Sequence, residues 1–265
     1  MNPQSSKQVY QDETLDDLII GGYKMIQPRQ GYRFSVDAVL LSHFPDLKKV
    51  KQVVDLGSGN GVIPLILAAR SGSIRIIGIE IQEIMVKRAR RSLEYNRLQE
   101  QVEIIQGDLQ AIEKYLPAAS TDLVLSNPPF WGKGEGRISK NPEEACARHE
   151  IAMDLKGLIR AAAYLLSPGG SFCLIHRAER LTDIINLCTT HRLLPVRLRT
   201  VHSFCQEEAK LILLEAQRRD QGRLQVLPPL VIYNKPGEYS EEINRFYYTN
   251  PPCPEDTLKG TGNQL

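Results

Sequence analysis

The tetrapeptide at residues 127–130, Asn-Pro-Pro-Phe, is the segment of this chain whose residue types point most directly to a chemistry. It follows an apolar run at residues 123–126, which is typical of a buried strand. The amide oxygen of Asn127 and the backbone carbonyl of Pro128 can each accept an N–H from a planar amine, and Phe130 offers a face for base stacking. Such an amine is a poor nucleophile because its lone pair is delocalised, so acceptors that favour a pyramidal nitrogen would stabilise the transition state. The tetrapeptide therefore indicates methyl transfer to a planar nitrogen.

A glycine-rich turn at the end of an earlier apolar run could bind the methyl donor. It begins at Asp55 and continues with Gly57, Gly59 and Gly61 at alternate positions. A dinucleotide fingerprint would place its third glycine one residue later, and a P-loop would need a Lys followed by Ser or Thr, which this turn lacks. Because nothing nearby supplies a cation for a triphosphate, the turn favours a nucleoside cofactor without one. S-adenosylmethionine is the candidate.

Two acidic residues follow the next two predicted strands. Glu80 comes after residues 74–79, where a carboxylate can accept hydrogen bonds from both ribose hydroxyls. Asp108 follows the strand predicted at residues 102–105 and could accept from an adenine amino group. Ligands bind outside the carboxyl ends of parallel strands, so these side chains are expected to converge with the glycine turn. Each feature alone also fits a tight turn or a helix N-cap. Together they favour cofactor binding, with an NAD-linked enzyme as a minor alternative.

Alternating strand and helix patterns, beginning near residue 50, must position these residues. This alternation predicts an α/β domain with a mostly parallel sheet and helices on both faces. The last two strands have no helix between them and are expected to pair antiparallel. A turn is predicted at residues 167–170 from its Ser-Pro-Gly-Gly sequence. The predicted strands cover residues 53–56, 74–79, 102–105, 122–126, 171–175, 195–201 and 210–216, and the predicted helices cover 62–69, 82–96, 155–166 and 180–190.

The composition is that of an ordinary globular protein. The 265 residues are 42% hydrophobic and 24% charged, and the net charge of +2 shows no overall basicity toward nucleic acid. The five cysteines include no Cys-x-x-Cys pair, so neither a disulfide framework nor a metal site is expected. The N-terminus is polar and no apolar run approaches the length of a membrane span. We therefore expect a cytoplasmic protein without a membrane partner.

A glycine-rich stretch with an aromatic residue and cations follows the tetrapeptide. Trp131 and Lys133 lie in it, and further basic residues follow at Arg137 and Lys140. Such a loop beside the reacting base would suit RNA phosphates and base stacking. A solvent-exposed flexible loop fits the same composition, so both interpretations remain open.

Five segments in this order carry a resemblance to a known family. They are Gly-Tyr-Lys-Met-Ile-Gln at residues 22–27, Phe-Ser-Val-Asp-Ala-Val-Leu-Leu at 34–41, the turn at 55–61, the tetrapeptide at 127–130, and Ala-Arg-His-Glu at 147–150. Over nearly its whole length the chain resembles bacterial tRNA1(Val) (adenine-37-N6)-methyltransferases and their relatives among class I S-adenosylmethionine-dependent methyltransferases.

The resemblance implies a fold, a domain division and a substrate. It implies a Rossmann-like, seven-stranded, mostly parallel methyltransferase sheet whose last strand is antiparallel. Residues 1–45 would form a cap segment over the cofactor site, residues 46–247 the methyltransferase domain, and residues 248–265 a flexible tail. The substrate would be the exocyclic N6 of an adenine in RNA, specifically tRNA.

The resemblance also implies roles for individual residues. Phe34 and Asp37 would lie over the cofactor, with Phe34 (or the neighbouring Tyr32) near its methionine end. Asn127 would be the catalytic acceptor for the amine and would also contact the cofactor. Arg148 would border the substrate side or stabilise the loop that follows Phe130.

Asn-Pro-Pro-aromatic segments leave other substrates open. They also mark enzymes that methylate guanine N2 in ribosomal RNA or the glutamine amide of release factors. The segment at residues 34–41 favours the tRNA adenine group, because the long helical recognition domain of the release-factor enzymes is not evident. A non-catalytic RNA-binding module on the same fold is a different class of function. The intact Asn127, Glu80, Asp108 and glycines argue against it.

Overall fold

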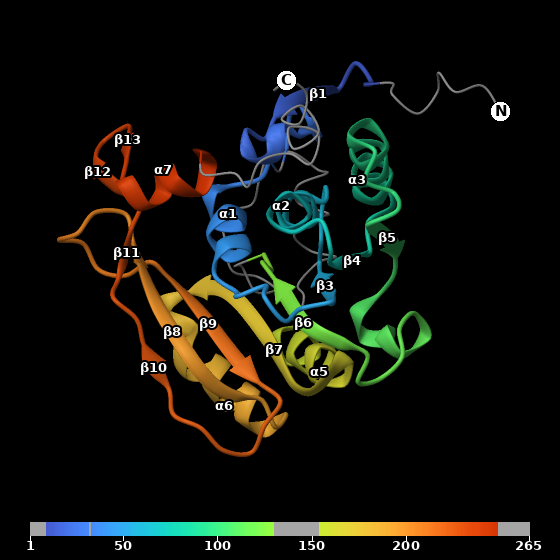
Figure 1. Cartoon of the computed structure of the whole chain (residues 1–265). Coiled ribbons are helices and arrows are strands. Elements are labelled where there is room, and N and C mark those ends of the chain that lie inside the picture. The colour runs from blue at the N-terminus through green and yellow to red at the C-terminus, as the bar shows by residue number, and fades with distance from the viewer. Residues whose placement is uncertain (1–8, 32, 130–153, 249–265) are drawn as a thin grey trace, which may run out of the picture.

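The computed structural model describes residues 9–31, 33–129 and 154–248 (Figure 1). A central sheet lies between two layers of helices. One layer holds α1 (Val36–His43), α2 (Val62–Arg70) and α3 (Glu83–Asn96), and the other holds α5 (Leu155–Leu165) and α6 (Leu181–Thr190). This confirms the predicted α/β class with helices on both faces.

Seven strands of the sheet have the predicted arrangement. Their spatial order is β5-β4-β3-β6-β7-β9-β8, and only β9 runs antiparallel to the others. Two short strands, β10 (Gln225–Val226) and β11 (Leu230–Val231), pair with the outer edge of β8 and extend the sheet to nine strands. The seven are β3 (Gln52–Leu56), β4 (Arg75–Glu80), β5 (Val102–Gln106), β6 (Thr121–Ser126), β7 (Leu166–Arg177), β8 (Leu194–His202) and β9 (Leu211–Gln217).

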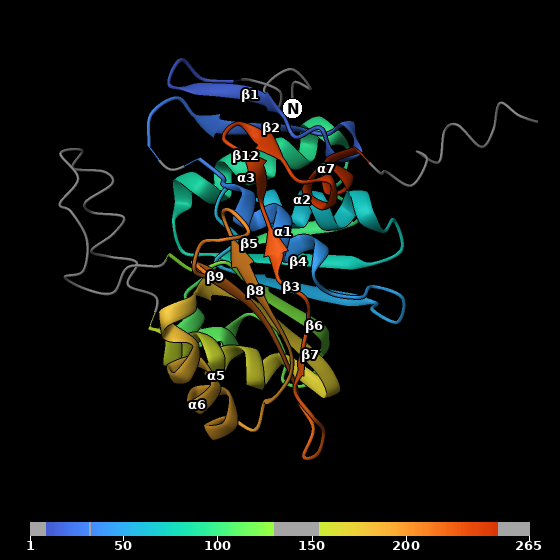
Figure 2. The same ribbon diagram turned by 90° about the vertical axis from the view of Figure 1, so that its left-hand side faces the viewer.

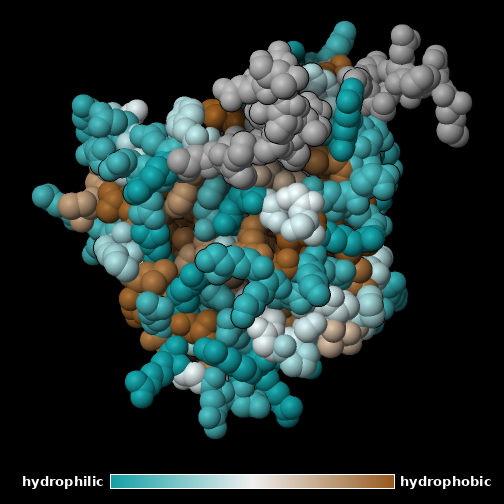
Figure 3. All heavy atoms as spheres, in the orientation of Figure 1, coloured by the Kyte–Doolittle hydropathy of each residue, from teal (hydrophilic) through white to brown (hydrophobic). Residues whose placement is uncertain are grey.

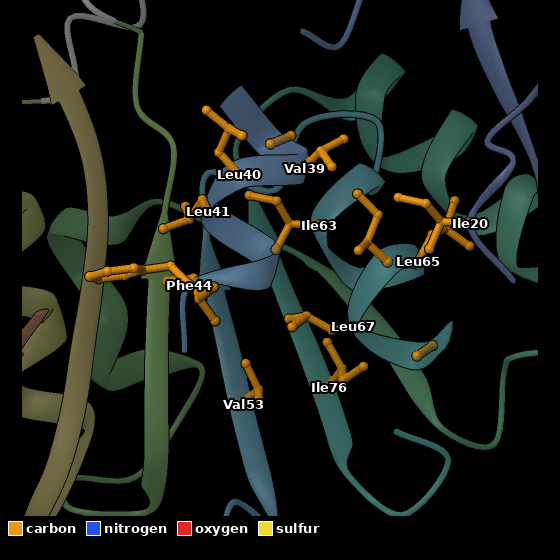
Figure 4. Packing of buried hydrophobic residues seen from close by; sticks show 14 of the residues in the cluster. Ile20, Val39, Leu40, Leu41, Phe44, Val53, Ile63, Leu65, Leu67 and Ile76 are labelled. Atoms are coloured by element: carbon orange, nitrogen blue, oxygen red, sulfur yellow. The ribbon is translucent and has the colours of Figure 1, made fainter. Parts of the chain in front are cut away.

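Alternate side chains of each strand enter two separate cores. Val53 packs in the cluster under α1 to α3, whereas the next residue, Val54, packs in the cluster on the opposite face. Figure 4 shows Leu67 of α2 beside Ile76 of β4, and Ile63 of α2 near Leu41 of α1. Both faces of the parallel strands are therefore apolar, as expected for a sheet enclosed by helices.

The prediction that a turn at residues 167–170 separates a helix from the next strand is wrong. The helix α5 ends at Leu165 and β7 begins at the next residue. Pairing with β6 then jumps from Leu166 to Ser171, so the four residues between them form an irregularity within the strand. Gly169, with φ of 80°, adopts a left-handed conformation that glycine tolerates, which lets the chain bulge and rejoin the sheet.

Several elements lie outside the predicted pattern. Near the N-terminus β1 (Glu13–Asp17) and β2 (Lys24–Pro28) form an antiparallel hairpin. After the sheet come β12 (Tyr233–Lys235), β13 (Glu238–Tyr239) and α7 (Glu241–Tyr248). Three short 3-10 helices complete the described elements: η1 (Ile20–Gly22), η2 (Leu109–Lys114) and η3 (Ala178–Arg180).

The surface and the helix lengths agree with this layered fold. On the face shown in Figure 3, hydrophilic residues cover most of the described surface. None of the helices in the three described segments is both long and apolar enough to span a bilayer.

A buried ionic cluster fixes the N-terminal hairpin on α3, beside which it lies in Figures 1 and 2. Glu13 of β1 is 2% exposed and accepts hydrogen bonds from Arg88 Nε at 3.0 Å and from Arg91 Nη1 and Nη2 at 2.7 and 2.6 Å. Burial alone would raise the pKa of Glu13. The hydrogen bonds from Arg91, from the Tyr10 backbone and from Arg88 outweigh it and lower this pKa to about 2.

We expect Glu13→Gln to lower the free energy of unfolding by about 2–3 kcal/mol near neutral pH, because the guanidinium groups of Arg88 and Arg91 lose the buried carboxylate that they share. The pKa of about 2 in the folded protein lies below the ordinary 4.5, so this stabilisation is complete above pH 4.5 and is lost as the pH falls toward 2. In urea unfolding, the difference between wild type and variant should shrink as the pH falls from about 4.5 to about 2. A difference that is independent of pH would contradict the ionic role of Glu13.

Candidate active site

The carboxyl ends of β3, β4 and β6 bring the predicted site residues to one edge of the sheet. In the register, Asp55 of β3 lies opposite both Gly78 of β4 and Leu125 of β6. Ser126 Oγ at the end of β6 donates to the Leu56 carbonyl at 2.7 Å and is fully buried. This bond holds the start of the Asn-Pro-Pro segment beside the start of the glycine turn.

The glycine turn is held against the end of β4. Gly57, Gly59 and Gly61 have φ angles of 78°, 54° and 84°, a left-handed conformation that side chains with a Cβ rarely adopt. The backbone N–H groups of Gly57 and Ser58 both donate to the Ile79 carbonyl, at 2.9 and 3.0 Å. These bonds attach the turn to β4, and α2 begins directly after it.

Gly78 makes the close approach of the turn possible. A Cβ at this position would lie 2.7 Å from Ser58 Oγ and 2.7 Å from the Ile104 side chain. Any side chain on β4 here would push the turn away from the sheet. Sequence reasoning did not single out Gly78, although a glycine inside an apolar strand is a known sign of close backbone approach.

Glu80 connects the glycine turn to the start of α3. Its carboxylate is buried; Oε2 accepts the Gly59 N–H at 2.9 Å and Oε1 accepts the Gln82 N–H at 2.9 Å. Burial raises the pKa of Glu80, and these backbone hydrogen bonds offset only part of that effect. Each carboxylate oxygen can accept a further hydrogen bond, so the group can receive donors from a ligand.

Asp55 lies beneath the turn with unsatisfied oxygens. It is fully buried, and neither carboxylate oxygen has a hydrogen-bond partner within the described part of the chain. Ser58 Oγ and Asn60 Oδ1, also buried, share this property. Burial, followed by the negative charge of Glu80, raises the pKa of Asp55 well above its ordinary range. Buried acceptors of this kind call for donors from elsewhere.

The set of donors and acceptors fits S-adenosylmethionine better than a polyphosphate. Buried acceptor oxygens suit a ligand that brings hydroxyl, amino and positively charged groups, whereas phosphates require cations and N–H donors. No lysine or arginine of the described ranges contributes to the shifted pKa values of Asp55 and Glu80. The arrangement can therefore bind a cationic nucleoside and present it to the end of β6.

Asp108 lies at the same edge and also has a structural role as a helix cap. The N–H of Gly107 donates to the Glu80 carbonyl at 2.9 Å, which places Asp108 near the end of β4. The exposed Asp108 carboxylate caps η2, because Oδ1 accepts the Gln110 N–H at 2.8 Å. The cap interpretation weighed from the sequence is thus correct for one of its oxygens, and it does not exclude a ligand contact.

The Asn-Pro-Pro-Phe tetrapeptide is described only in part. Asn127 is half-buried, Pro128 is buried and the following Pro129 is exposed. The predicted base-stacking residue Phe130 lies outside the described residues. The predicted substrate contacts Trp131, Lys133 and Arg148 also lie outside them.

The start of α1 reaches the same edge of the sheet. Burial, a neighbouring tyrosine and the charge of Asp37 raise the pKa of Tyr233, which lies just past the carboxyl end of β8. At the other end of α1, the Phe44 carbonyl accepts from Arg197 Nη2 near the start of β8, at 2.7 Å. The helix therefore runs away from the edge, with Phe34 and Asp37 at the end nearer the carboxyl edge of the sheet. Phe34 is half-buried, and burial raises the pKa of Asp37.

Two apolar side chains at this edge were missed by sequence reasoning. Ile81 and Ile84 are 47% and 51% exposed, directly after Glu80 and in the first turn of α3. A planar base needs apolar surface beside its polar partners. The sequence could have indicated them, because both are apolar and closely follow a carboxylate at the end of a predicted strand. Elsewhere, no group of three or more His, Cys, Asp or Glu residues within the described ranges could hold a metal ion.

Comparisons with known proteins find methyltransferases. A family model described as "Methyltransferase small domain" matches residues 35–186. A tRNA1(Val) (adenine(37)-N6)-methyltransferase of Porphyromonas gingivalis is 33% identical over 230 residues, which cover 82% of this chain and 89% of that protein. An enzyme of the same name from Aeromonas hydrophila is 28% identical over 218 residues, covering 80% and 87%.

Solved structures support the fold. A predicted O-methyltransferase of Agrobacterium tumefaciens has a TM-score of 0.64 at 22% identity, covering 80% of this chain and 94% of that one. A geranyl diphosphate C-methyltransferase of Streptomyces coelicolor, solved with S-adenosyl-L-homocysteine, has a TM-score of 0.51 at 12% identity, covering 69% and 75%. At these identities the likeness concerns the fold alone.

The family model covers more than half of the chain, and the Porphyromonas relative aligns over most of both proteins. The resemblance expected from the sequence motifs is thus confirmed, as are the enzyme class and the cofactor. This chain belongs to the tRNA1(Val) (adenine(37)-N6)-methyltransferase family within the methyltransferase small domain proteins, and it is an S-adenosylmethionine-dependent methyltransferase.

Proposed function

We propose that this enzyme transfers a methyl group from S-adenosylmethionine to the exocyclic N6 of an adenine in tRNA, in the cytoplasm where tRNA is available. The observation that carries the proposal is the position of Asn127 and Pro128, which the bond from Ser126 to Leu56 holds beside the glycine turn. The names of the relatives support adenine in tRNA as the acceptor.

The proposed mechanism rests on two neutral acceptors. The Asn127 amide oxygen and the Pro128 carbonyl each accept one N–H of the adenine amine. This favours a tetrahedral nitrogen whose lone pair points away from the two acceptors. The bound cofactor supplies an electrophilic methyl on a sulfonium sulfur. As the N–C bond forms and the S–C bond breaks, the amine becomes cationic and acidic, so its proton can pass to water without a strong base in the protein.

The cofactor half of the proposed site lies over β3, β4 and β5. Glu80 accepts from the ribose hydroxyls. Asp108 accepts from the adenine amino group through the carboxylate lone pairs that the cap of η2 does not use. Asp55 and the turn of Gly57, Gly59 and Gly61 bind near the cofactor's charged end, where the unsatisfied oxygens support a donor-rich ligand. Phe34 and Asp37 cover the methionine end, and Asn127 lies between cofactor and amine.

The substrate half of the proposed site rests on the sequence. Phe130 and Trp131 provide aromatic faces for the flipped base and its neighbours. Lys133 and Arg148 approach RNA phosphates. All four residues follow the end of β6 in the chain, which supports their placement on the substrate side.

The proposed reaction is tested by transfer of labelled methyl from S-adenosylmethionine to unmodified total tRNA, with the digested nucleosides identified by mass spectrometry. We expect the label in N6-methyladenosine. An enzyme that binds S-adenosylmethionine but leaves tRNA unlabelled would contradict the tRNA assignment. Labelling of guanine N2 in ribosomal RNA, or of a glutamine amide in protein, would then identify the substrate.

Asn127→Ala is expected to lower turnover by about 100-fold or more, because the amine loses an acceptor that acts in the transition state. The affinity for S-adenosylmethionine in calorimetry should stay nearly unchanged, because the proposed cofactor contacts on β3 and β4 remain. Equal losses of turnover and of cofactor affinity would show that Asn127 acts through cofactor binding.

Glu80→Ala is expected to weaken S-adenosylmethionine binding by about 1.5–3 kcal/mol, the usual worth of hydrogen bonds to a charged group. The matched control is Glu83→Ala, which removes an exposed carboxylate in the first turn of α3 that pairs with Lys87 at 2.6 Å. Calorimetry should show a loss for the Glu80 variant and none for the control. Unchanged affinity in Glu80→Ala would contradict the proposed contact between Glu80 and the ribose.

A further inference from the structure

Gln27 at the end of the N-terminal hairpin is a buried amide whose two polar atoms hold separate partners. Its side chain is 2% exposed. Oε1 accepts the backbone N–H of Phe34 at 3.0 Å, and Nε2 donates to Asp16 Oδ2 at 2.6 Å. The hairpin is thereby linked to the residue proposed to cover the methionine end of the cofactor.

A second attachment of the same segment comes from Arg33. It forms an ion pair with Asp16 and donates to Thr14 Oγ1 at 3.1 Å and to the Pro28 carbonyl at 3.2 Å. Two consecutive residues that lead into α1 are thus attached to the hairpin. The Asp16 carboxylate accepts hydrogen bonds from both Arg33 and Gln27. A backbone held at several points has few alternative conformations.

The hairpin is in turn fixed to α3, the helix that begins beside Glu80. The Ile26 N–H donates to Ser92 Oγ at 2.9 Å. The Asn96 amide exchanges two hydrogen bonds with the Lys24 backbone, at 2.9 and 2.6 Å. A continuous series of contacts therefore runs from α3 through β2 to the segment before α1.

We propose that Gln27 is a positioning residue of the cofactor site, which holds residues 33–37 in the conformation that receives the methionine end of S-adenosylmethionine. The inference rests on the proposed placement of Phe34 and Asp37 over the cofactor. It assigns the hairpin a role in cofactor affinity in addition to its packing on α3. Gln27 touches neither cofactor nor substrate in this account and acts through the Phe34 backbone.

The test is Gln27→Leu, which keeps similar size and removes both hydrogen bonds. If the binding conformation of residues 33–37 falls to about a tenth of the population, the dissociation constant of S-adenosylmethionine rises about tenfold. We expect this rise in calorimetry without RNA, a matching rise in KM for the cofactor with a smaller change in kcat, and faster hydrogen exchange of residues 33–37 in the cofactor-free protein.

The matched control is Lys24→Ala. It removes an exposed ion pair within the same hairpin, Lys24 Nζ to Asp17 Oδ2 at 2.6 Å, and it leaves Gln27, Asp16 and Phe34 in place. Its affinity for S-adenosylmethionine and the exchange of residues 33–37 should equal those of the wild type. A control that loses as much affinity as Gln27→Leu would overturn the specific role of Gln27.

Unchanged affinity and unchanged hydrogen exchange in a folded Gln27→Leu variant would also overturn the proposal. If this variant does not fold, Arg33→Leu decides, because it loosens the same segment from a half-exposed position. Weaker S-adenosylmethionine binding would support the proposal, and wild-type affinity would refute it. Because calorimetry and hydrogen exchange use no RNA, a failure of the tRNA assignment leaves the outcome of these two measurements interpretable.

Discussion

The candidate site depends on the carboxylate of Glu80, which holds two separate pieces of backbone at once. One oxygen accepts from Gly59 in the glycine turn and the other from Gln82 at the start of α3. Both partners are backbone N–H groups, so the contact constrains the path of the chain rather than the choice of side chains. Gly78 allows the turn to approach β4 closely enough for this arrangement to form.

The same geometry gives the cofactor-free site an electrostatic cost. Two carboxylates, Asp55 and Glu80, are buried near each other, and burial raises the pKa of each. Buried acceptors without donors are unfavourable, so a ligand that brings hydroxyl, amino and cationic groups would remove part of this cost on binding. A preformed site of this kind loses little conformational entropy when the cofactor binds.

The sheet and the convergence of the site could be predicted from the sequence because both depend on local patterns. Apolar runs followed by Gly57, Glu80 or Asn127 identify strand ends, and parallel strands must bring those ends together. The N-terminal hairpin could not be predicted in this way. Its stability comes from Glu13 meeting arginines 75 and 78 positions later in the chain, a contact that no local pattern contains.

Other gaps in the prediction have the same physical origin. The bond from Ser126 to Leu56 joins residues 70 positions apart, and the role of Gln27 is evident only once Phe34 lies beside it. The Pro-Gly sequence before Ser171 has the composition of a turn, yet pairing with β6 on both sides keeps it within β7. In each case a tertiary contact overrides or completes what local preference indicates.

The most direct test of the account is a crystal structure of the protein with S-adenosylhomocysteine. We expect the ribose hydroxyls within about 2.6–3.2 Å of the Glu80 oxygens. We also expect the sulfur to face Asn127 and the amino acid end to lie near Asp55 and Phe34. A ligand bound away from the glycine turn, or a ribose without contact to Glu80, would contradict the account.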